Sequence, residues 1–251
     1  MAKYLKLFKN QEEYEEYKNS GMILPNVSHC IQDVKIYFNQ STPPTPPTPS
    51  HDYVEIGGIK WATMNVGSTG ITDDGFYFQW GDTQGYTASQ VGGGEGQKAF
   101  TGYDYKYTLD AGQTFTKYNI NDRKVTLDSS DDAVSAAWGC NWRMPTTDEF
   151  QVLMNAVNRT WTYNYEGSGV AGLICTDKTD SSKVLFFPAA GYANGGSVYQ
   201  TRTGYYWSSS VYRYDYKFEK AYTISFSNGL NDWDLTAYRY YGHLVRGVLD
   251  E

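Results

Sequence analysis

A run of prolines and threonines divides this chain and limits what either side of it can fold into. Residues 42–49 read Thr-Pro-Pro-Thr-Pro-Pro-Thr-Pro. Proline fixes φ and has no backbone N–H, so the run favours a stiff polyproline conformation and cannot continue a sheet or a helix. We therefore expect residues 41–52 to link a small module, residues 1–40, to a larger domain, residues 53–251. A ligand for SH3-type modules would need flanking basic or aromatic determinants, which this run lacks.

The segment before the linker has the pattern of a small α/β module. Residues 4–8 alternate like a strand, Asn10 and Glu13 resemble a capping box that opens a short helix, and residues 34–38 read as a second strand. Forty residues rarely form an independent core. We therefore expect residues 1–40 to attach to another protein or to form a homo-oligomer.

Short apolar runs separated by glycine-rich turns follow the linker. We expect a hairpin at residues 54–62 and strands at residues 76–80, 184–187 and 221–226. Along the last of these, strict alternation predicts that Tyr222, Ile224 and Phe226 face inward and that Thr223 and Ser225 face outward.

Two helices are expected among these strands. One runs from Ser130 to Trp138 behind Asp131, and the other runs from Thr146 to Asn158, with Thr146 and Glu149 forming a capping box. The second helix places an apolar stripe on one face, which consists of Phe150, Leu153, Met154 and Val157. A few helices among many strands predict an α+β domain.

The bulk composition excludes several classes of protein. A net charge of −7 and only 21 dispersed basic residues argue against a nucleic-acid-binding surface, which needs clustered Lys and Arg. No signal peptide and no run of membrane-spanning length are found, so membrane insertion is not expected. Three cysteines without a CxxC pattern predict neither a disulfide framework nor a zinc site.

Tyrosine is concentrated near the C-terminal end. Nine of the 24 tyrosines lie between Tyr205 and His243, interleaved with Asn, Asp, Ser and Arg. Large rigid amphipathic rings beside small polar residues are typical of binding surfaces. The alternative is a tyrosine-rich sheet whose rings only pack. The residues expected to contact a ligand are Tyr212, Arg213, Tyr214, Asp215, Tyr216, Ser225, Leu230, Asn231, Asp232, Trp233, Asp234, Tyr238 and Tyr240.

Several phrases, taken in order, resemble a known family. They are Trp142-Arg-Met-Pro-Thr-Thr-Asp-Glu149, Phe187-Pro-Ala-Ala-Gly-Tyr192, Gly204-Tyr-Tyr-Trp-Ser-Ser-Ser210 and Tyr241-Gly-His-Leu-Val-Arg-Gly-Val248, preceded by Met64-Asn-Val-Gly67 and Trp80-Gly-Asp82. This order is similar to that of C-type-lectin-like domains of the formylglycine-generating-enzyme-like type. The resemblance implies an irregular, mostly antiparallel C-type lectin-like fold over residues 53–251, with a last strand that returns beside the first.

Within that family, the C-terminal segment most resembles the variable proteins of diversity-generating retroelements, which phages and bacteria carry. The resemblance implies a surface at residues 205–248 whose positions vary by mutagenesis of adenines, as in asparagine codons. It also implies a non-enzymatic protein, displayed on a virion assembled in the bacterial cytoplasm or on a cell surface, that binds a host- or cell-surface protein or glycan. Residues 1–40 would then contact virion tail proteins.

Three alternatives remain open at this stage. The domain could be a paralogous bacterial surface protein with a fixed ligand, a structural virion protein whose tyrosines pack, or an oxidase of the formylglycine-generating type. The oxidase carries cysteines close to its C-terminus, whereas the last cysteine here is Cys175, which we expect to be buried. The only histidines are His29, His51 and His243, so a base for a catalytic cysteine is scarce.

No cofactor or metal is expected. The Glu-Pro-Asn or Gln-Pro-Asp loop of sugar-binding C-type lectins is absent, and the order of Asn231-Asp-Trp-Asp234 differs from the strand motif of that calcium site. Calcium could still bind the aspartates at 128–132 or 177–180, since it needs only oxygen ligands. Their spacing matches no EF-hand, and helix capping and turn formation explain them more economically. The glycines at 92–96 lack the Gly-Lys-Ser/Thr ending of a phosphate loop, so they predict a surface loop.

Overall fold

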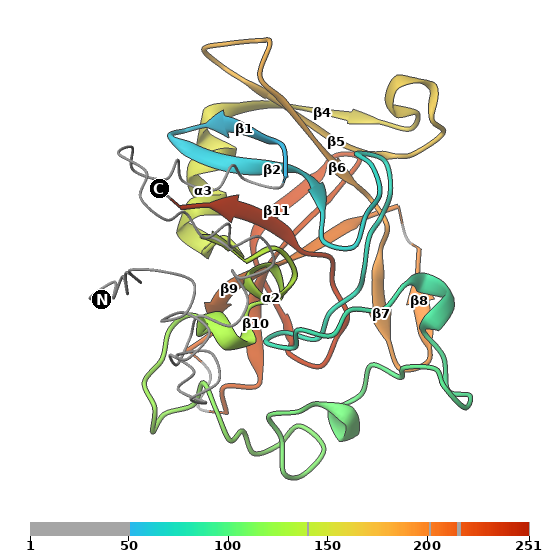
Figure 1. Cartoon of the computed structure of the whole chain (residues 1–251), viewed down its shortest axis with the longest axis vertical. Helices are drawn as coiled ribbons and strands as arrows, with labels where there is room; N and C mark the ends of the chain where they lie inside the picture. The colour runs from blue at the N-terminus through green and yellow to red at the C-terminus, as the bar shows by residue number, and fades with distance from the viewer. Residues whose placement is uncertain (1–50, 140, 201, 215–216, 251) are drawn as a thin grey trace, which may run out of the picture. The chain divides into compact units, whose positions relative to one another are not determined.

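Antiparallel strands dominate the part of the chain that the structure describes, which is residues 51–139, 141–200, 202–214 and 217–250 of a computed structural model (Figure 1). For residues 230–234 only the backbone is described. The expected N-terminal module, residues 1–40, lies outside the described residues, as does nearly all of the linker. The described strands and helices give an α+β domain, as the sequence predicts.

The strands form four sheets. They are β1 (Tyr53–Ile56), β2 (Ile59–Asn65), β3 (Trp142–Arg143), β4 (Val157–Thr162), β5 (Gly172–Asp177), β6 (Val184–Pro188), β7 (Tyr192–Asn194), β8 (Ser197–Tyr199), β9 (Gly204–Val211), β10 (Lys220–Ser227), β11 (Leu230–Tyr238) and β12 (Arg246–Leu249). The α-helices are α2 (Ala133–Trp138) and α3 (Thr147–Ala156).

The two ends of the domain meet in the sheet β1-β2-β12-β3. The expected hairpin is confirmed, because β1 pairs with β2 across Gly57 and Gly58, whose φ values of 63° and 76° suit glycine. β12 pairs with β2 on one side and with β3 on the other. The last strand therefore joins the first hairpin beside β2 and not beside β1.

The capping box predicted at Thr146 is present and starts α3. The Thr146 hydroxyl accepts from the Glu149 N–H at 3.2 Å, and the Glu149 carboxylate accepts from the Thr146 N–H at 2.7 Å. Phe150, Leu153 and Met154 are buried as expected. Val157 is also buried, but it is the first residue of β4, so the helix ends before the expected Asn158.

The first helix is shorter than expected. Residues 129–131 form a 3-10 turn, and α2 begins only at Ala133 with Asp132 as its N-cap. The Asp132 carboxylate accepts from the N–H groups of Val134 and Ser135, both at 2.9 Å. Asp131 is used differently, because its carboxylate accepts hydrogen bonds from Lys117 and Tyr118. A run of adjacent aspartates cannot show from sequence alone which of them caps the helix.

The strand predicted at residues 76–80 does not form. Tyr77 and Phe78 make isolated bridges to Tyr86 and His243, within a long segment that runs from β2 toward α2 with few regular elements (Figure 1). Aromatic residues in this segment are nevertheless core residues: Tyr77 and Trp80 are fully buried. The apolar pattern at residues 76–80 therefore predicted burial correctly but predicted a strand that does not form.

The sheet β11-β10-β9 carries the tyrosine-rich segment. Ile224 and Phe226 of the central strand β10 enter the core as expected. The outward assignment of Thr223 and Ser225 is wrong, since these side chains are 2% and 8% exposed. Their face of the sheet is covered by a second layer, in which His243 bonds to Thr223. Alternation finds the two faces of a strand but cannot show that both are covered.

Two further expectations concern chemistry. Cys175 on β5 is fully buried, and burial raises the pKa of its thiol to about 12, so it is an inert core residue as expected. No helix among the described residues is both long and apolar enough to span a membrane.

Candidate functional site

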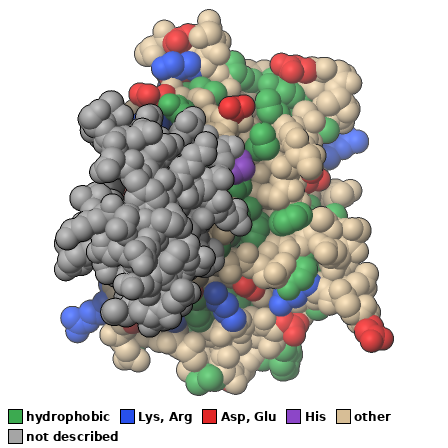
Figure 2. Space-filling view, in the orientation of Figure 1, with side chains coloured by type: hydrophobic (Ala, Val, Ile, Leu, Met, Phe, Trp, Pro, Cys, Tyr) green, Lys and Arg blue, Asp and Glu red, His purple; other side chains and the backbone are tan. Residues whose placement is uncertain are grey.

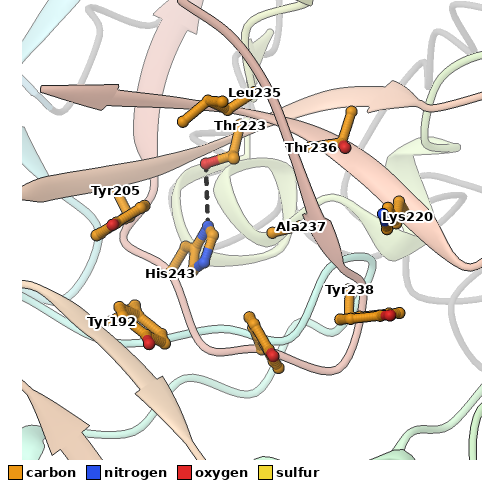
Figure 3. Close-up of a pocket in the computed structure, with 10 residues that line it drawn as sticks. Tyr192, Tyr205, Lys220, Thr223, Leu235, Thr236, Ala237, Tyr238 and His243 are labelled. Atoms are coloured by element: carbon orange, nitrogen blue, oxygen red, sulfur yellow. Dashed lines mark hydrogen bonds between the residues drawn. The ribbon is translucent and has the colours of Figure 1, made fainter. Parts of the chain in front are cut away.

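The outer face of the sheet β11-β10-β9 holds a pocket of about 250 Å³ (Figure 3). Its walls come from all three strands of this sheet, from β7 and from the segment that leads into β12. The lining residues are Tyr192, Tyr205, Lys220, Thr223, Leu235, Thr236, Ala237, Tyr238, Tyr241 and His243. The pocket is small by the standard of drug-sized sites, and it suits a single ring or side chain.

Tyr192 reaches the pocket because β7 is bridged to the segment before β12. Ala193 and Gly242 exchange both backbone hydrogen bonds, at 2.7 and 2.8 Å. The preceding Gly191 has a φ of 77°, and a Cβ there would lie 1.9 Å from the Tyr199 carbonyl oxygen. Only glycine fits this close approach, so the glycine sets the direction in which the Tyr192 ring leaves β7.

His243 forms the floor of the pocket and is fixed on several sides. Its ring stacks on Trp207, with centroids 4.0 Å apart and an interplanar angle of 20°. Its backbone pairs with Phe78 through hydrogen bonds of 2.9 and 3.1 Å. Nδ1 lies 3.0 Å from Oγ1 of Thr223, the contact drawn in Figure 3. Burial lowers the pKa of His243 to about 3, so the imidazole is neutral at physiological pH.

A buried arginine, Arg239, lies in the sequence between two tyrosines at the rim of the pocket. Arg239 is fully buried, and its guanidinium donates to the backbone oxygens of Lys117 and Tyr118. Its neighbours Tyr238 and Tyr240 are only half-buried and stack on each other at 5.3 Å. The inward Arg239 therefore anchors the turn after β11 so that both flanking rings stay accessible.

The pocket tyrosines belong to one continuous aromatic array. Tyr192 stacks on Tyr199 at 5.2 Å and lies 5.8 Å from Tyr241. Tyr241 in turn meets Tyr238 edge-on at 5.6 Å. Such ring pairs restrict each other, so a ligand would meet rings that are already ordered.

The electrostatics of the array favour neutral phenols. Burial raises the pKa of Tyr240 to about 12, and the neighbouring Tyr241 adds to the effect. Burial also raises the pKa values of Tyr205 and Tyr241. These hydroxyls therefore keep their protons at physiological pH and can both donate and accept hydrogen bonds.

Among the lining residues that the structure describes, Lys220 is the charged one. Its Nζ lies 5.3 Å from the centroid of the Tyr238 ring, in a cation–π contact. On the face of the molecule shown in Figure 2, acidic and basic side chains are scattered and do not form a large patch of one sign. The described lining of the pocket is mainly aromatic, with one cation in contact with Tyr238.

The structure brings some of the predicted ligand residues together. Tyr238 lines the pocket, and Tyr240 stacks on it. The ring centroids of Tyr212 and the 85%-exposed Tyr214 lie 5.7 Å apart, and Tyr212 contacts Tyr222 of β10 edge-on. Tyr212 and Tyr222 are half-buried, so Tyr214 is the exposed member of this second group of rings.

The remaining predicted residues are placed less favourably or are not described. Arg213 is exposed beside Tyr214, whereas Ser225 is buried and does not present its hydroxyl at the surface. Asp215 and Tyr216 lie outside the described residues. The backbone of β11 carries a further set, whose side chains are not described, namely Leu230, Asn231, Asp232, Trp233 and Asp234.

Sequence reasoning missed most of the pocket. The tyrosine density that singled out residues 205–243 includes Tyr205 and Tyr241, so that signal could have found them. Tyr192 and His243 gave no such signal, because the pairing of β7 with Gly242 creates their proximity. Thr223 was expected to face outward, but it is buried beneath His243 at the floor of the pocket.

No cluster of metal-ligating side chains occurs among the described residues. The aspartates considered for calcium serve the backbone, since Asp132 caps α2 and Asp177 accepts from the N–H groups of Thr179 and Asp180. Capping and turn formation therefore account for Asp132 and Asp177, as the sequence indicates, whereas Asp128 and Asp131 form ion pairs with Lys117.

Comparisons of the chain with protein-family models, with curated proteins and with solved structures found no match.

Proposed function

We propose that this chain is a non-enzymatic binding protein that recognises its ligand through the tyrosine array and the pocket within it. One observation carries the proposal. Four tyrosine rings surround a pocket on the outer face of a sheet, and they are held in place by a scaffold of buried residues. Ordered aromatic rings with hydroxyl tips give large contact areas at low entropic cost, which is the chemistry of a recognition surface.

We further propose a family for this chain and a location where its tyrosine array meets a ligand. The motifs around Trp142, Phe187, Gly204 and Tyr241 support a C-type lectin-like fold of the formylglycine-generating-enzyme-like type. Their similarity to retroelement-diversified variable proteins supports display on a phage virion or a cell surface, where the array binds a host- or cell-surface protein or glycan. Several copies on one particle would add avidity to modest individual affinities.

The roles of the motif residues give the family proposal a physical basis. Arg143 in the Trp-Arg-Met-Pro phrase is clamped by two carboxylates, with Glu149 at 2.6 Å and Asp250 at 2.8 Å. Arg246 in the last motif is fully buried, and it donates to Asn65, to the Ala62 carbonyl and to the Phe186 carbonyl. Both arginines join distant parts of the chain, so these motif positions serve the scaffold and leave the tyrosine array free for recognition.

The experiment compares binding of the full chain to intact bacteria of several species and to their purified surface polysaccharides and outer-membrane proteins. Tyr238→Ala is expected to weaken binding at least about fivefold, because truncating a central aromatic residue of an interface costs more than about 1 kcal/mol. Tyr53→Ala is the matched control, since Tyr53 is an exposed tyrosine on β1 in a different sheet.

Loss of binding in both variants, or in neither, would remove the array from the recognition role. A loss of thermal stability in Tyr238→Ala with unchanged binding would favour the packing interpretation of the tyrosines. Oxygen uptake with cysteine peptides would contradict the non-enzymatic assignment.

A further inference from the structure

The floor of the pocket holds a ring nitrogen, Nε2 of His243, to which no described residue forms a hydrogen bond. His243 is 1% exposed, and among the described residues the hydrogen bond to its ring is the one between Nδ1 and Oγ1 of Thr223. No described residue bonds to Nε2, and Figure 3 shows the ring between Thr223 and the tyrosines of the pocket. A ligand hydroxyl placed beside Nε2 would form a hydrogen bond that the described residues do not supply.

The protonation of His243 follows from its neighbour. Thr223 has a single hydroxyl hydrogen, and its Oγ1 lies 2.9 Å from the carbonyl oxygen of Tyr206. The hydroxyl donates to that carbonyl, which cannot itself donate, so Oγ1 accepts from Nδ1–H of His243. Nε2 of the neutral ring then carries a lone pair and accepts a hydrogen bond from whatever enters the pocket.

The required donor is a neutral hydroxyl and not a cation. The ammonium of Lys220 lines the same pocket, and no carboxylate that could balance a second positive charge is found among the lining side chains that the structure describes. Burying an unpaired cation beside another is unfavourable. The four tyrosine rings would otherwise suit a quaternary or primary ammonium group, so Lys220 decides between the two kinds of ligand.

The distribution of polar groups favours a ligand with several hydroxyls. Besides Nε2 of His243, the lining residues Tyr192, Tyr238 and Tyr241 carry phenol hydroxyls, and Lys220 carries an ammonium group. An aromatic side chain of a peptide has at most one hydroxyl to match them. A pyranose ring has hydroxyls on several sides and an apolar C–H face that can lie on a tyrosine ring.

We propose that the pocket binds one pyranose residue of a surface glycan, with a sugar C–H face on the tyrosine rings and one sugar hydroxyl donating to Nε2 of His243. This inference rests on the proposed function and assigns its ligand class. It needs no metal ion, because the protein groups themselves supply the hydrogen bonds. The volume of about 250 Å³ suits one ring, with the rest of the glycan passing over Tyr240 and the exposed residues beyond it.

The test uses the full chain and small probes. Methyl α-D-glucopyranoside, methyl α-D-mannopyranoside, methyl β-D-galactopyranoside and N-acetylglucosamine are titrated by saturation-transfer NMR, with N-acetyltyrosine amide as the peptide-like probe. At least one pyranoside is expected to bind. His243→Phe keeps a ring over Trp207 but removes the acceptor, and it is expected to weaken that binding about tenfold, the value of one hydrogen bond.

A second variant keeps the test decisive if His243→Phe does not fold. Tyr241→Ala removes one stacking ring and is expected to weaken pyranoside binding by a similar factor, while the control Tyr53→Ala leaves it unchanged. Preference for N-acetyltyrosine amide, absence of binding by every pyranoside, or equal binding by all variants would overturn the inference. If cells or surface proteins still bind through Tyr238 in that case, the proposed function stands and only the ligand class is wrong.

Discussion

Tyrosines only a few residues apart have opposite environments in this protein. Tyr206 on β9 is fully buried, its hydroxyl donates to the Pro188 carbonyl at 2.9 Å, and it accepts from the Asn65 side chain at 3.2 Å. Tyr214 beyond the same strand is 85% exposed. Residue type alone therefore does not separate recognition from packing, whereas the position of each ring relative to the core does.

This contrast gives a prediction at the scale of single residues. Tyr214→Ala is expected to change the free energy of unfolding by less than about 0.5 kcal/mol, because the ring is in solvent. Tyr206→Ala is expected to cost about 3–5 kcal/mol, as large-to-small aromatic substitutions in cores do. Urea denaturation of the two variants measures both values. Similar losses for the two would mean that the exposed rings also stabilise the fold.

At the scale of elements, the capping box that starts α3 also takes part in a tertiary contact. Glu149 completes the capping box of this helix and also binds Arg143, which in turn holds Asp250 near the C-terminal end. Burial alone would raise the pKa of Glu149, but hydrogen bonds from Arg143 and from the Thr146 N–H outweigh this effect and lower it. The same carboxylate therefore stabilises the helix start and its attachment to β3.

The lowered pKa predicts how stability depends on pH. A carboxyl whose pKa is lower in the folded state stabilises the fold above its unfolded pKa, and that stabilisation is lost as the pH falls through the folded pKa. Glu149→Gln is thus expected to cost about 1.5–3 kcal/mol at pH 7, and the difference from wild type should shrink below about pH 4.3, the ordinary value for glutamate. Urea denaturation from pH 7 to pH 3 measures the trend.

Asp148→Asn is the control for this prediction. Asp148 lies in the same helical turn, is exposed and loses the same charge, but it does not belong to the capping box. Its cost should be smaller than that of Glu149→Gln. Equal costs at pH 7, or a difference that persists unchanged at pH 3, would assign the effect to helix charge and not to the Arg143 contact.

The helices and strands also show which features of the fold could be predicted from the sequence. The capping box at Thr146 and the hairpin at residues 54–62 depend on neighbouring residues, so they were predicted correctly. The covered faces of Thr223 and Ser225, and the strand expected at residues 76–80, depend on contacts with distant segments. The pocket belongs to the second kind, because Tyr192 and His243 meet only through long-range pairing.

At the scale of the whole molecule, the described residues form two hydrophobic clusters that share several strands. Trp61 belongs to one cluster and its neighbour Ala62 on β2 to the other, and Tyr206 and Trp207 on β9 divide in the same way. Because neighbouring residues of a strand point to opposite faces, these strands have core side chains on both faces.

Deletion of residues 1–40 tests whether this segment serves self-association and is not needed for the stability of the domain at residues 53–251. We expect the shortened protein to keep its melting temperature within about 2 °C, corresponding to less than about 1 kcal/mol for a domain of this size. We also expect the full chain to have the mass of an oligomer in light scattering and the shortened protein to have the mass of a monomer. The reason is that a 40-residue module with little core of its own gains stability by self-association. If both proteins have the mass of a single chain, residues 1–40 do not drive oligomerisation, and attachment to a different protein is left as their role. If the deletion lowers the melting temperature by much more than about 2 °C, residues 1–40 belong to the folded domain itself.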